Sequence, residues 1–182
     1  MAASWHQGQT RRSGDPHITH PLAVATILAE TGADDQVLCA ALLHDTIADT
    51  PYTLAALSCE FGAQVAALVA GTAALDQIKS RGRRTVSLAA VKRADTRVLA
   101  IKLADRLHNM RTVQFIPQAR QLRKAGESLD IFVRVAARLG MDTIEVELEA
   151  LAWATMRRNR HARSACGRLD PHPPATRPPA GG

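Results

Sequence analysis

The spacing of the apolar residues constrains the fold of this chain more than any other feature of its sequence. They recur every three or four positions, and no window shows the strict two-residue alternation of a half-buried strand. One run begins at Pro21 and stops at Gly32, residue types that commonly start and end helices. Aromatic residues form only 3% of the chain, so small aliphatic side chains must fill the core, which favours packed helices over a sheet. The sequence therefore predicts an all-α fold.

Capping and breaking residues place the other helices. Asp34 or Asp35 can cap a helix that runs from Gln36 to about Ile47, and Thr53 can cap a short helix that ends near residue 62. Residues 63–70 continue as another helix, and the basic residues 79–84 are expected to form a loop. Further helices are predicted over residues 87–93, 95–110, 117–125, 128–139 and 142–156, with Gly126 and Gly140 as breakers.

The composition changes after residue 156. Residues 157–182 hold six arginines and five prolines but almost no large apolar residue. Such a segment buries too little surface to offset the entropy of ordering it. We therefore expect one domain over residues 1–156, followed by a basic, disordered tail over residues 157–182.

The cysteine pattern and the lack of long apolar segments indicate the compartment. The three cysteines are far apart and form no CxxC motif, which fits a reducing environment. Residues 1–12 lack the apolar segment of a secretory signal. The longest uncharged stretch, residues 61–75, is shorter than the roughly 20 residues that span a bilayer. A cytoplasmic protein without a membrane partner is the expectation.

The net charge of +6 is unevenly distributed along the chain. Residues 79–124 carry 13 basic and 2 acidic side chains, whereas residues 1–78 carry 2 basic and 8 acidic ones. A basic protein invites the hypothesis of nucleic-acid binding, but no nucleic-acid motif accompanies the charge. We rank nucleic acid last among the partners, and the distribution favours a small anionic ligand.

Polar residues that interrupt apolar helices mark the candidate site. His44 and Asp45 end an apolar run, and Asp105 lies inside another. A buried charge without a partner costs several kcal/mol, so these residues need one. Asn109 and Thr112 follow Asp105 by four and seven residues, which places all three on one face of a helix.

Histidine and aspartate ligands without thiolates suit Mn, Fe, Mg or Zn. Each residue also has an ordinary interpretation. His44 can be hydrogen-bonded at a helix end, Asp105 can pair with Arg106 or Lys102, and His20 can cap the helix that follows it. Other histidines offer no spacing argument and are expected to be solvated or locally bonded, namely His6, His17, His161 and His172.

Three stretches, in order, resemble the hydrolase domains of the RelA/SpoT homologues. Residues 6–21, HQGQTRRSGDPHITHP, resemble the pattern HxGQxRxSGxPYxxHP, and residues 42–50, LLHDTIADT, resemble LLHDTxEDT. Residues 102–112, KLADRLHNMRT, match the family motif without a change. Residues 127–129, 137–140 and 147–149 resemble the shorter family signposts ETL, HRLG and ELE. The likeness extends from His6 to about Trp153.

The resemblance implies a helical bundle of the HD-domain type and a metal-dependent hydrolase, usually with Mn²⁺, although other divalent ions remain compatible. Family members remove the 3′-pyrophosphate of the alarmone (p)ppGpp, a guanine nucleotide of the stringent response, giving GDP or GTP and pyrophosphate. By position, the metal ligands correspond to His20, His44, Asp45 and Asp105. The guanine contacts correspond to Arg11 and Arg12, with Asn109 and Thr112 lining the nucleoside pocket. Independently of the resemblance, the basic composition of residues 79–93 offers positive charge for the phosphates, and a solvated basic loop is the equally ranked alternative.

The chain departs from the family pattern at a position that bears on catalysis. The family has Glu-Asp after the HD pair, whereas this chain has Ala48 and Asp49. The missing glutamate is a water-activating group, and losing a general base typically costs about 10²–10⁴-fold in rate. Asp49 remains as the expected catalytic residue. The signpost GVTKL is replaced by Gly-Thr-Ala-Ala-Leu at residues 71–75, and few residues precede the first motif.

Three interpretations of function follow. The first is a guanosine-3′,5′-bis(diphosphate) 3′-pyrophosphohydrolase, weakened by Ala48, that resembles small alarmone hydrolases because no synthetase domain is present. The second is a catalytically inactive, nucleotide-binding regulatory domain. The third is a related purine-nucleotide phosphohydrolase. Association into a homo-oligomer stays open.

Overall fold

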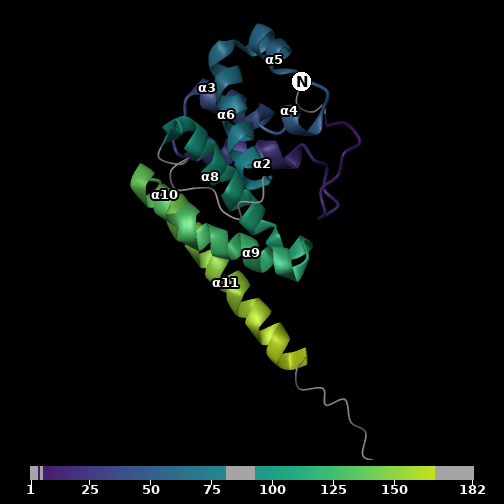
Figure 1. Cartoon of the computed structure of the whole chain (residues 1–182), viewed down its shortest axis with the longest axis vertical. Helices are drawn as coiled ribbons and strands as arrows, with labels where there is room; N and C mark the ends of the chain where they lie inside the picture. The colour runs from purple at the N-terminus through teal and green to yellow at the C-terminus, as the bar shows by residue number, and fades with distance from the viewer. Residues whose placement is uncertain (1–3, 5, 81–92, 167–182) are drawn as a thin grey trace, which may run out of the picture.

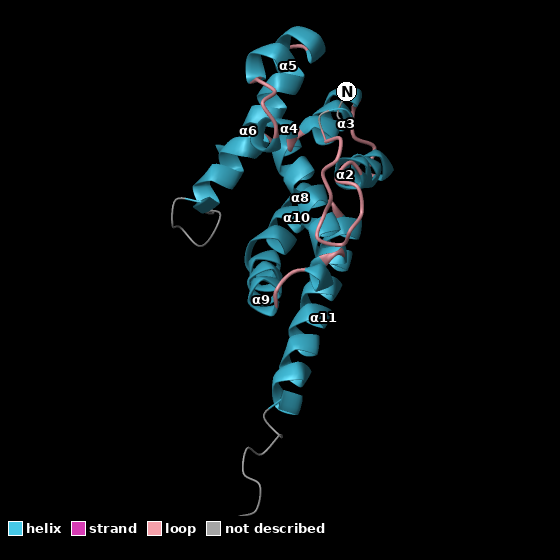
Figure 2. Ribbon diagram, turned by 90° about the vertical axis from the view of Figure 1, so that its right-hand side faces the viewer, coloured by secondary structure: helices cyan, strands magenta, loops and turns pink. Residues whose placement is uncertain are grey.

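The computed structural model describes the backbone of residues 4, 6–80 and 93–166 (Figure 1). All regular secondary structure in these ranges is helical, which confirms the all-α prediction (Figure 2). An isolated antiparallel bridge between Thr10 and Pro16 closes the N-terminal loop. Among the helices of the described residues, none is long and apolar enough to cross a membrane.

The described residues fold into a succession of helices joined by short connections. In chain order these are α2 (Thr19–Glu30), α3 (Asp35–Leu43), α4 (Thr46–Asp49), α5 (Leu54–Phe61), α6 (Ala63–Ser80), α8 (Thr96–Arg111), the 3₁₀ turn η1 (Val113–Phe115), α9 (Gln118–Glu127), the π-helical turn η2 (Ser128–Phe132), α10 (Val133–Leu139) and α11 (Asp142–Cys166). The predicted caps form. Asp34 accepts a hydrogen bond from the amide of Val37 at 2.9 Å, and Thr53 accepts one from the amide of Ala56 at 3.2 Å.

Helix α8 lies at the centre of the fold and carries most of the candidate residues. It packs against α2, α3 and α6 on one side and against α10 and α11 on the other. Its side chains Ile101, Leu103 and Ala104 are completely buried. Helix α11 continues beyond the other helices, so that the molecule is elongated (Figure 1). This arrangement brings the start of α2 and the end of α3 to the same stretch of α8.

Several predicted helix boundaries were wrong. The helix expected to reach Ile47 ends at Leu43, because the side chains of His44 and Thr46 bond to carbonyls of its last turn. Gly126 does not break a helix, since α9 continues through η2 into α10. Gly140 does end its helix, in the left-handed conformation with φ of 67°.

Two further boundaries lie farther along the chain than predicted. Helix α6 continues to Ser80, so residues 79–80 are helical and do not belong to a loop. The last helix runs to Cys166, well past the boundary expected at residue 156. Residues 81–92, which include most of the helix predicted over 87–93, and residues 167–182, which include the distal tail, lie outside the described residues.

Candidate metal and nucleotide site

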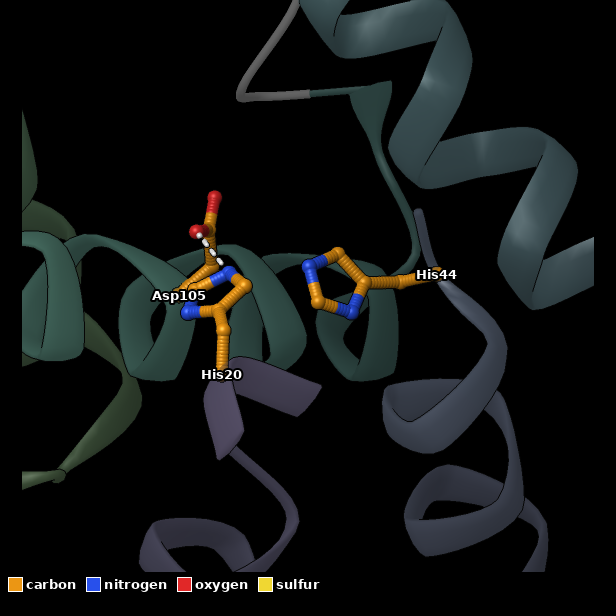
Figure 3. A group of neighbouring side chains, drawn as sticks. All are labelled: His20, His44 and Asp105. Atoms are coloured by element: carbon orange, nitrogen blue, oxygen red, sulfur yellow. Dashed lines mark ion pairs between the residues drawn. The ribbon is translucent and has the colours of Figure 1, made fainter. Parts of the chain in front are cut away.

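Three predicted metal ligands from three different segments lie close together at α8. His20 lies in the first turn of α2, His44 directly follows α3, and Asp105 lies on α8. One ligand atom from each lies within 4.8 Å of the others, and Figure 3 shows the two imidazoles and the carboxylate facing a common point. Two nitrogens and one oxygen at this spacing suit a divalent transition metal.

The orientation of His44 leaves one ring nitrogen available. Its Nδ1 donates a hydrogen bond to the carbonyl oxygen of Ala41 at 2.7 Å. Its Nε2 is buried and makes no hydrogen bond among the described residues, and it lies 3.1 Å from Oδ1 of Asp45. A buried nitrogen without a hydrogen bond is costly unless another group binds it. This orphaned nitrogen therefore fits a bound metal ion.

A contact with His108 orients the ring of His20. The Nδ1 atoms of the two rings are 2.8 Å apart, and Nε2 of His20 lies 3.3 Å from Oδ1 of Asp105. Burial, with the nearby charges of His20 and Arg11, lowers the pKa of His108 to about 4. His108 is therefore neutral at pH 7, and its Nδ1 can accept a hydrogen bond from Nδ1 of His20. That hydrogen bond leaves the lone pair of His20 on Nε2, on the side of the carboxylates.

Asp105 is held in its charged form. Its Oδ2 lies 2.7 Å from Nζ of Lys102, and its Oδ1 accepts a hydrogen bond from the amide of Asn109. Although burial acts in the opposite direction, the charge of Lys102 and the adjacent imidazole of His20 hold the pKa of Asp105 well below its usual value. The pairing with Lys102, one of the two ordinary partners considered, forms alongside the ligand geometry. Arg106, the other, pairs with Glu127 instead.

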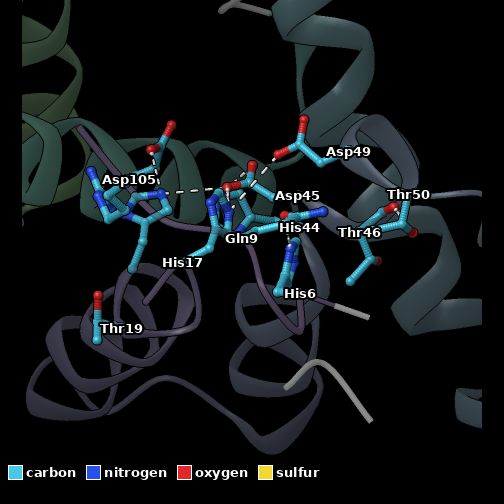
Figure 4. A network of polar contacts seen from close by, with 12 residues as sticks. His6, Gln9, His17, Thr19, His44, Asp45, Thr46, Asp49, Thr50 and Asp105 are labelled. Atoms are coloured by element: carbon cyan, nitrogen blue, oxygen red, sulfur yellow. Dashed lines mark hydrogen bonds and ion pairs between the residues drawn. The ribbon is translucent and has the colours of Figure 1, made fainter. Parts of the chain in front are cut away.

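The fourth predicted ligand, Asp45, lies between this group and a second one. Its Oδ2 is 3.6 Å from Nε2 of His20 and 3.7 Å from Nε2 of His17. Although burial raises the pKa of Asp45, the nearby imidazoles of His17 and His44 bring it below its usual value. His17, Asp45 and Asp49 form the second group of possible metal ligands (Figure 4). Burial and the charge of Asp45 raise the pKa of Asp49.

Two histidines that the sequence analysis set aside contribute to this region. His17 lies 3.9 Å from Oδ2 of Asp49, and its pKa is raised, chiefly by the nearby carboxylate of Asp45. His6 is buried, and its ring stacks on that of His17 with centroids 4.4 Å apart. His6 is bonded locally, to Gln9, which is one of the two expected alternatives, whereas His17 lies beside carboxylates that are distant in sequence. Its position three residues before His20, one helical turn away, is the signal that could have identified it.

Ala48 offers no carboxylate at the position of the family glutamate. It lies in the short helix α4, where it is exposed beside Asp49. Asp49 keeps 46% of its side chain exposed, so it is accessible to a ligand. Asp49 is therefore the carboxylate that α4 places next to the two ligand groups.

A pocket of about 590 Å³ begins at the ligand groups and extends along α8. Arg11 crosses it, with its guanidinium 3.4 Å from Oδ1 of Asn109 and 3.4 Å from Oγ1 of Thr112. Arg12 also lines the pocket. The four residues that the resemblance connected with the guanine nucleotide thus line one pocket, although Arg11 and Thr112 are 101 positions apart.

Part of the positive charge of the pocket comes from α9, a helix that the sequence analysis did not single out. Arg120, Arg123 and Lys124 of α9 line the pocket together with Lys102 and Arg106 of α8. The charge was expected from residues 79–93, of which residues 81–92 lie outside the described residues. The spacing of Arg120 and Arg123, three residues apart on one helix face, is the signal that could have revealed this surface.

Comparison with known proteins identifies the family. The chain is 52% identical over 160 residues to the GTP pyrophosphokinase of Streptomyces coelicolor, which is 86% of this chain and 19% of that protein. It is 46% identical over 169 residues to the bifunctional (p)ppGpp synthase/hydrolase SpoT of Escherichia coli, covering 88% of this chain and 24% of that protein. The chain thus spans about a quarter or less of the length of these relatives.

The fold is similar to that of a solved structure described as a metazoan ortholog of SpoT that hydrolyses ppGpp. The TM-score is 0.62 at 27% sequence identity, and the match covers 82% of this chain and 88% of that one. The sequence model of the HD domain matches residues 1–142, which include every residue of the two ligand groups. The resemblance to the RelA/SpoT homologues is therefore confirmed, and this chain belongs to the HD domain family.

Proposed function

We propose that this chain hydrolyses the 3′-pyrophosphate of guanosine 3′,5′-bis(diphosphate), ppGpp, to give GDP and pyrophosphate. One observation carries the proposal: the ligand group of His20, His44 and Asp105 adjoins the same pocket that Arg11, Asn109 and Thr112 line. This adjacency supports a metal site beside a nucleoside-binding surface. The names of SpoT and of the solved structure point to this substrate class.

We propose that His20, His44, Asp45 and Asp105 hold a divalent metal ion, with Mn²⁺ as the preferred ion. The free Nε2 of His44 and the orientation of His20 by His108 support this assignment. When bound, such an ion lowers the pKa of water and polarises a phosphoryl oxygen. Lys102 keeps Asp105 charged, and hence able to serve as a ligand.

The nucleoside would bind along Arg11, Arg12, Asn109 and Thr112. A guanidinium plane can stack on a purine, and the amide and hydroxyl groups can donate to or accept from the base. The pocket volume of about 590 Å³ lies within the roughly 300–1,000 Å³ usual for small-molecule sites. Arg11 already bonds to Asn109 and Thr112, so the wall is ordered before the ligand arrives.

The phosphates would be held by the cations of α8 and α9. Arg120, Arg123 and Lys124 line the pocket from α9, a different helix from those that carry the proposed metal ligands. Arginine guanidinium groups fork to phosphate oxygens in charge-assisted pairs, which position a polyanion more firmly than a single point charge. A nucleotide with two diphosphate groups matches a pocket that combines cationic groups with a proposed metal site.

Hydrolysis consumes one water molecule. The oxygen of water forms a bond to the phosphorus attached to the 3′-oxygen of the ribose, and the bond between that phosphorus and the 3′-oxygen breaks. The 3′-oxygen leaves with a proton as a hydroxyl group, and pyrophosphate carries the new oxygen. Asp49 would accept the proton of the attacking water, since Ala48 supplies no base.

A second function is favoured by Ala48 itself. A chain that keeps the nucleotide pocket but lacks the family glutamate can act as a nucleotide-binding regulatory domain without turnover. The substitution Ala48→Glu separates the two functions. If it creates hydrolysis, or raises the rate by more than about 10²-fold, while the affinity for ppGpp barely changes, the regulatory domain is favoured. If the unsubstituted protein already turns over ppGpp, the hydrolase function is favoured.

The direct test is to incubate Mn²⁺-loaded protein with ppGpp and to measure GDP and pyrophosphate. The control is His44→Ala, with circular dichroism to confirm that the variant folds. Turnover no higher than that of His44→Ala contradicts the hydrolase. Parallel assays with other purine nucleotides that carry a 3′- or 2′-phosphate test the third interpretation, a related phosphohydrolase. We propose the cytoplasm as the place of this reaction.

A further inference from the structure

We propose that His17, Asp45 and Asp49 bind a second divalent cation beside the one assigned to His20, His44 and Asp105, with Asp45 shared between the two ions. The inference rests on the proposed first metal site, because Asp45 belongs to both. It concerns a property of this chain that the family pattern does not carry, since the position of His17 is tyrosine in the pattern PYxxHP.

The geometry of the second group supports a metal site. Ligand atoms of His17, Asp45 and Asp49 lie within 4.8 Å of one another. Nε2 of His17 is 3.7 Å from Oδ2 of Asp45 and 3.9 Å from Oδ2 of Asp49. These distances are too long for good direct hydrogen bonds. An ion about 2.0–2.2 Å from each ligand atom fits between them.

Asp45 has the orientation of a bridging carboxylate. Its Oδ1 lies 3.1 Å from Nε2 of His44, a member of the first group. Its Oδ2 lies between the two groups, 3.6 Å from Nε2 of His20 and 3.7 Å from Nε2 of His17. Figure 4 shows Asp45 between Asp105 on one side and Asp49 on the other. In two-metal sites the ions are about 3.5–4 Å apart, a separation that one carboxylate can bridge.

His17 is held in place before any ion binds. Its Nε2 is buried and has no hydrogen-bond partner among the described residues. Its ring stacks on that of His6, and Nδ1 of His6 lies 2.9 Å from Oε1 of Gln9. A buried polar atom without a partner calls for a ligand, and the stacked ring directs that atom toward the two carboxylates.

The second cation also suits the charge of the expected ligand. Lys102 offsets Asp105, and one divalent ion offsets Asp45 and Asp49 together, so a single ion leaves the centre neutral. A second ion makes the centre positive by two charges, which favours a diphosphate group. It also places a water-orienting group beside Ala48, where the family glutamate is missing.

The test counts the ions bound to each chain without any nucleotide. Metal-free protein is prepared with a chelator and titrated with Mn²⁺, with calorimetry for the stoichiometry and electron paramagnetic resonance for coupling between neighbouring ions. We expect two Mn²⁺ ions per chain with a spin-coupled signal. The variants His17→Tyr and Asp49→Asn are each expected to bind one ion, without the coupled signal.

Matched controls use the same substitutions at exposed positions. His161→Tyr on α11 and Asp130→Asn on η2 replace exposed residues that do not line the pocket, and these variants should still bind two ions. The inference is overturned if the unsubstituted chain binds only one ion, which is expected if a protonated His17 bridges the two carboxylates. It is also overturned if His17→Tyr or Asp49→Asn still binds two ions. Because no nucleotide is present, absent ppGpp hydrolysis with two bound ions contradicts the proposed function alone.

Discussion

His20 and His108 face each other through their Nδ1 atoms, which are 2.8 Å apart on neighbouring helices. This contact joins α2 to α8 at the centre of the ligand groups. The hydrogen bond between the two rings forms only while His108 is neutral, because two protonated rings would repel each other. The lowered pKa of His108 therefore couples the protonation of one ring to the orientation of a proposed metal ligand.

This coupling predicts a loss of stability in acid. The pKa of His108 is about 4 in the folded protein against an ordinary value of 6.5, so the unfolded chain binds more protons between these values. The contribution is fully present above pH 6.5 and is lost as the pH falls toward 4. Denaturation of metal-free protein at several pH values should show a steeper decline for the unsubstituted protein than for His108→Gln.

The control for this measurement is His161→Gln, because His161 is exposed on α11. That variant should follow the unsubstituted protein over the whole pH range. Equal pH dependence in His108→Gln and the unsubstituted protein would show that His108 titrates normally.

A bound metal should stabilise the fold. A ligand that binds only the folded state at 100 times its dissociation constant adds about 2.7 kcal/mol to the free energy of unfolding. Mn²⁺ should therefore raise the melting temperature of chelated protein. His44→Ala should lose most of this increase, because Nε2 of His44 has no other hydrogen-bond partner among the described residues. An equal increase of the melting temperature in His44→Ala would show that His44 is not a metal ligand.

Two ion pairs that cross between helices should differ in their contribution to stability. Arg106 pairs with Glu127 at 3.0 Å, with 5% and 17% of the two side chains exposed, and its guanidinium lies 4.2 Å from the ring centroid of Phe132. Glu127→Ala leaves a buried charge without its partner and should lower the free energy of unfolding by roughly 3–5 kcal/mol. Glu127→Gln keeps a hydrogen-bond acceptor and should lose less.

The matched pair lies on the surface. Arg111 and Glu147 join α8 to α11 at 2.6 Å, but 40% and 37% of their side chains are exposed. Glu147→Ala should therefore lower the free energy of unfolding by less than about 1 kcal/mol. Urea denaturation of the variants measures both effects. Similar decreases in the free energy of unfolding for Glu127→Ala and Glu147→Ala would show that burial does not set the contribution of these ion pairs.

Two helical glycines should respond in opposite ways to alanine. A Cβ at Gly71 would lie 2.7 Å from Cγ2 of Val98, whereas one at Gly126 would meet only Cε of Met156 at 3.8 Å. Gly71→Ala should destabilise the α6–α8 contact by about 1–3 kcal/mol, less any gain in helix propensity. Gly126→Ala should stabilise the protein by up to about 1 kcal/mol. Thermal unfolding of both variants provides the comparison.

The sequence alone determined the fold class and the proposed metal ligands. Apolar spacing predicted helices because a buried helix face must repeat every three or four residues. The motifs around His20, His44 and Asp105 were recognisable because each is local, with its chemistry within a few adjacent residues. The caps Asp34 and Thr53 were also predictable, since capping depends on residues three positions apart.

Only the tertiary structure decided what lies between the motifs. His17 belongs to a ligand group because the loop before α2 folds against the end of α3, a contact that no local pattern encodes. The cations of α9 face the pocket because α9 continues past Gly126 and packs on α11. Arg11 meets Thr112 across 101 positions because the loop before α2 lies against the end of α8. Long-range packing sets these distances, and single-residue preferences carry no information about them.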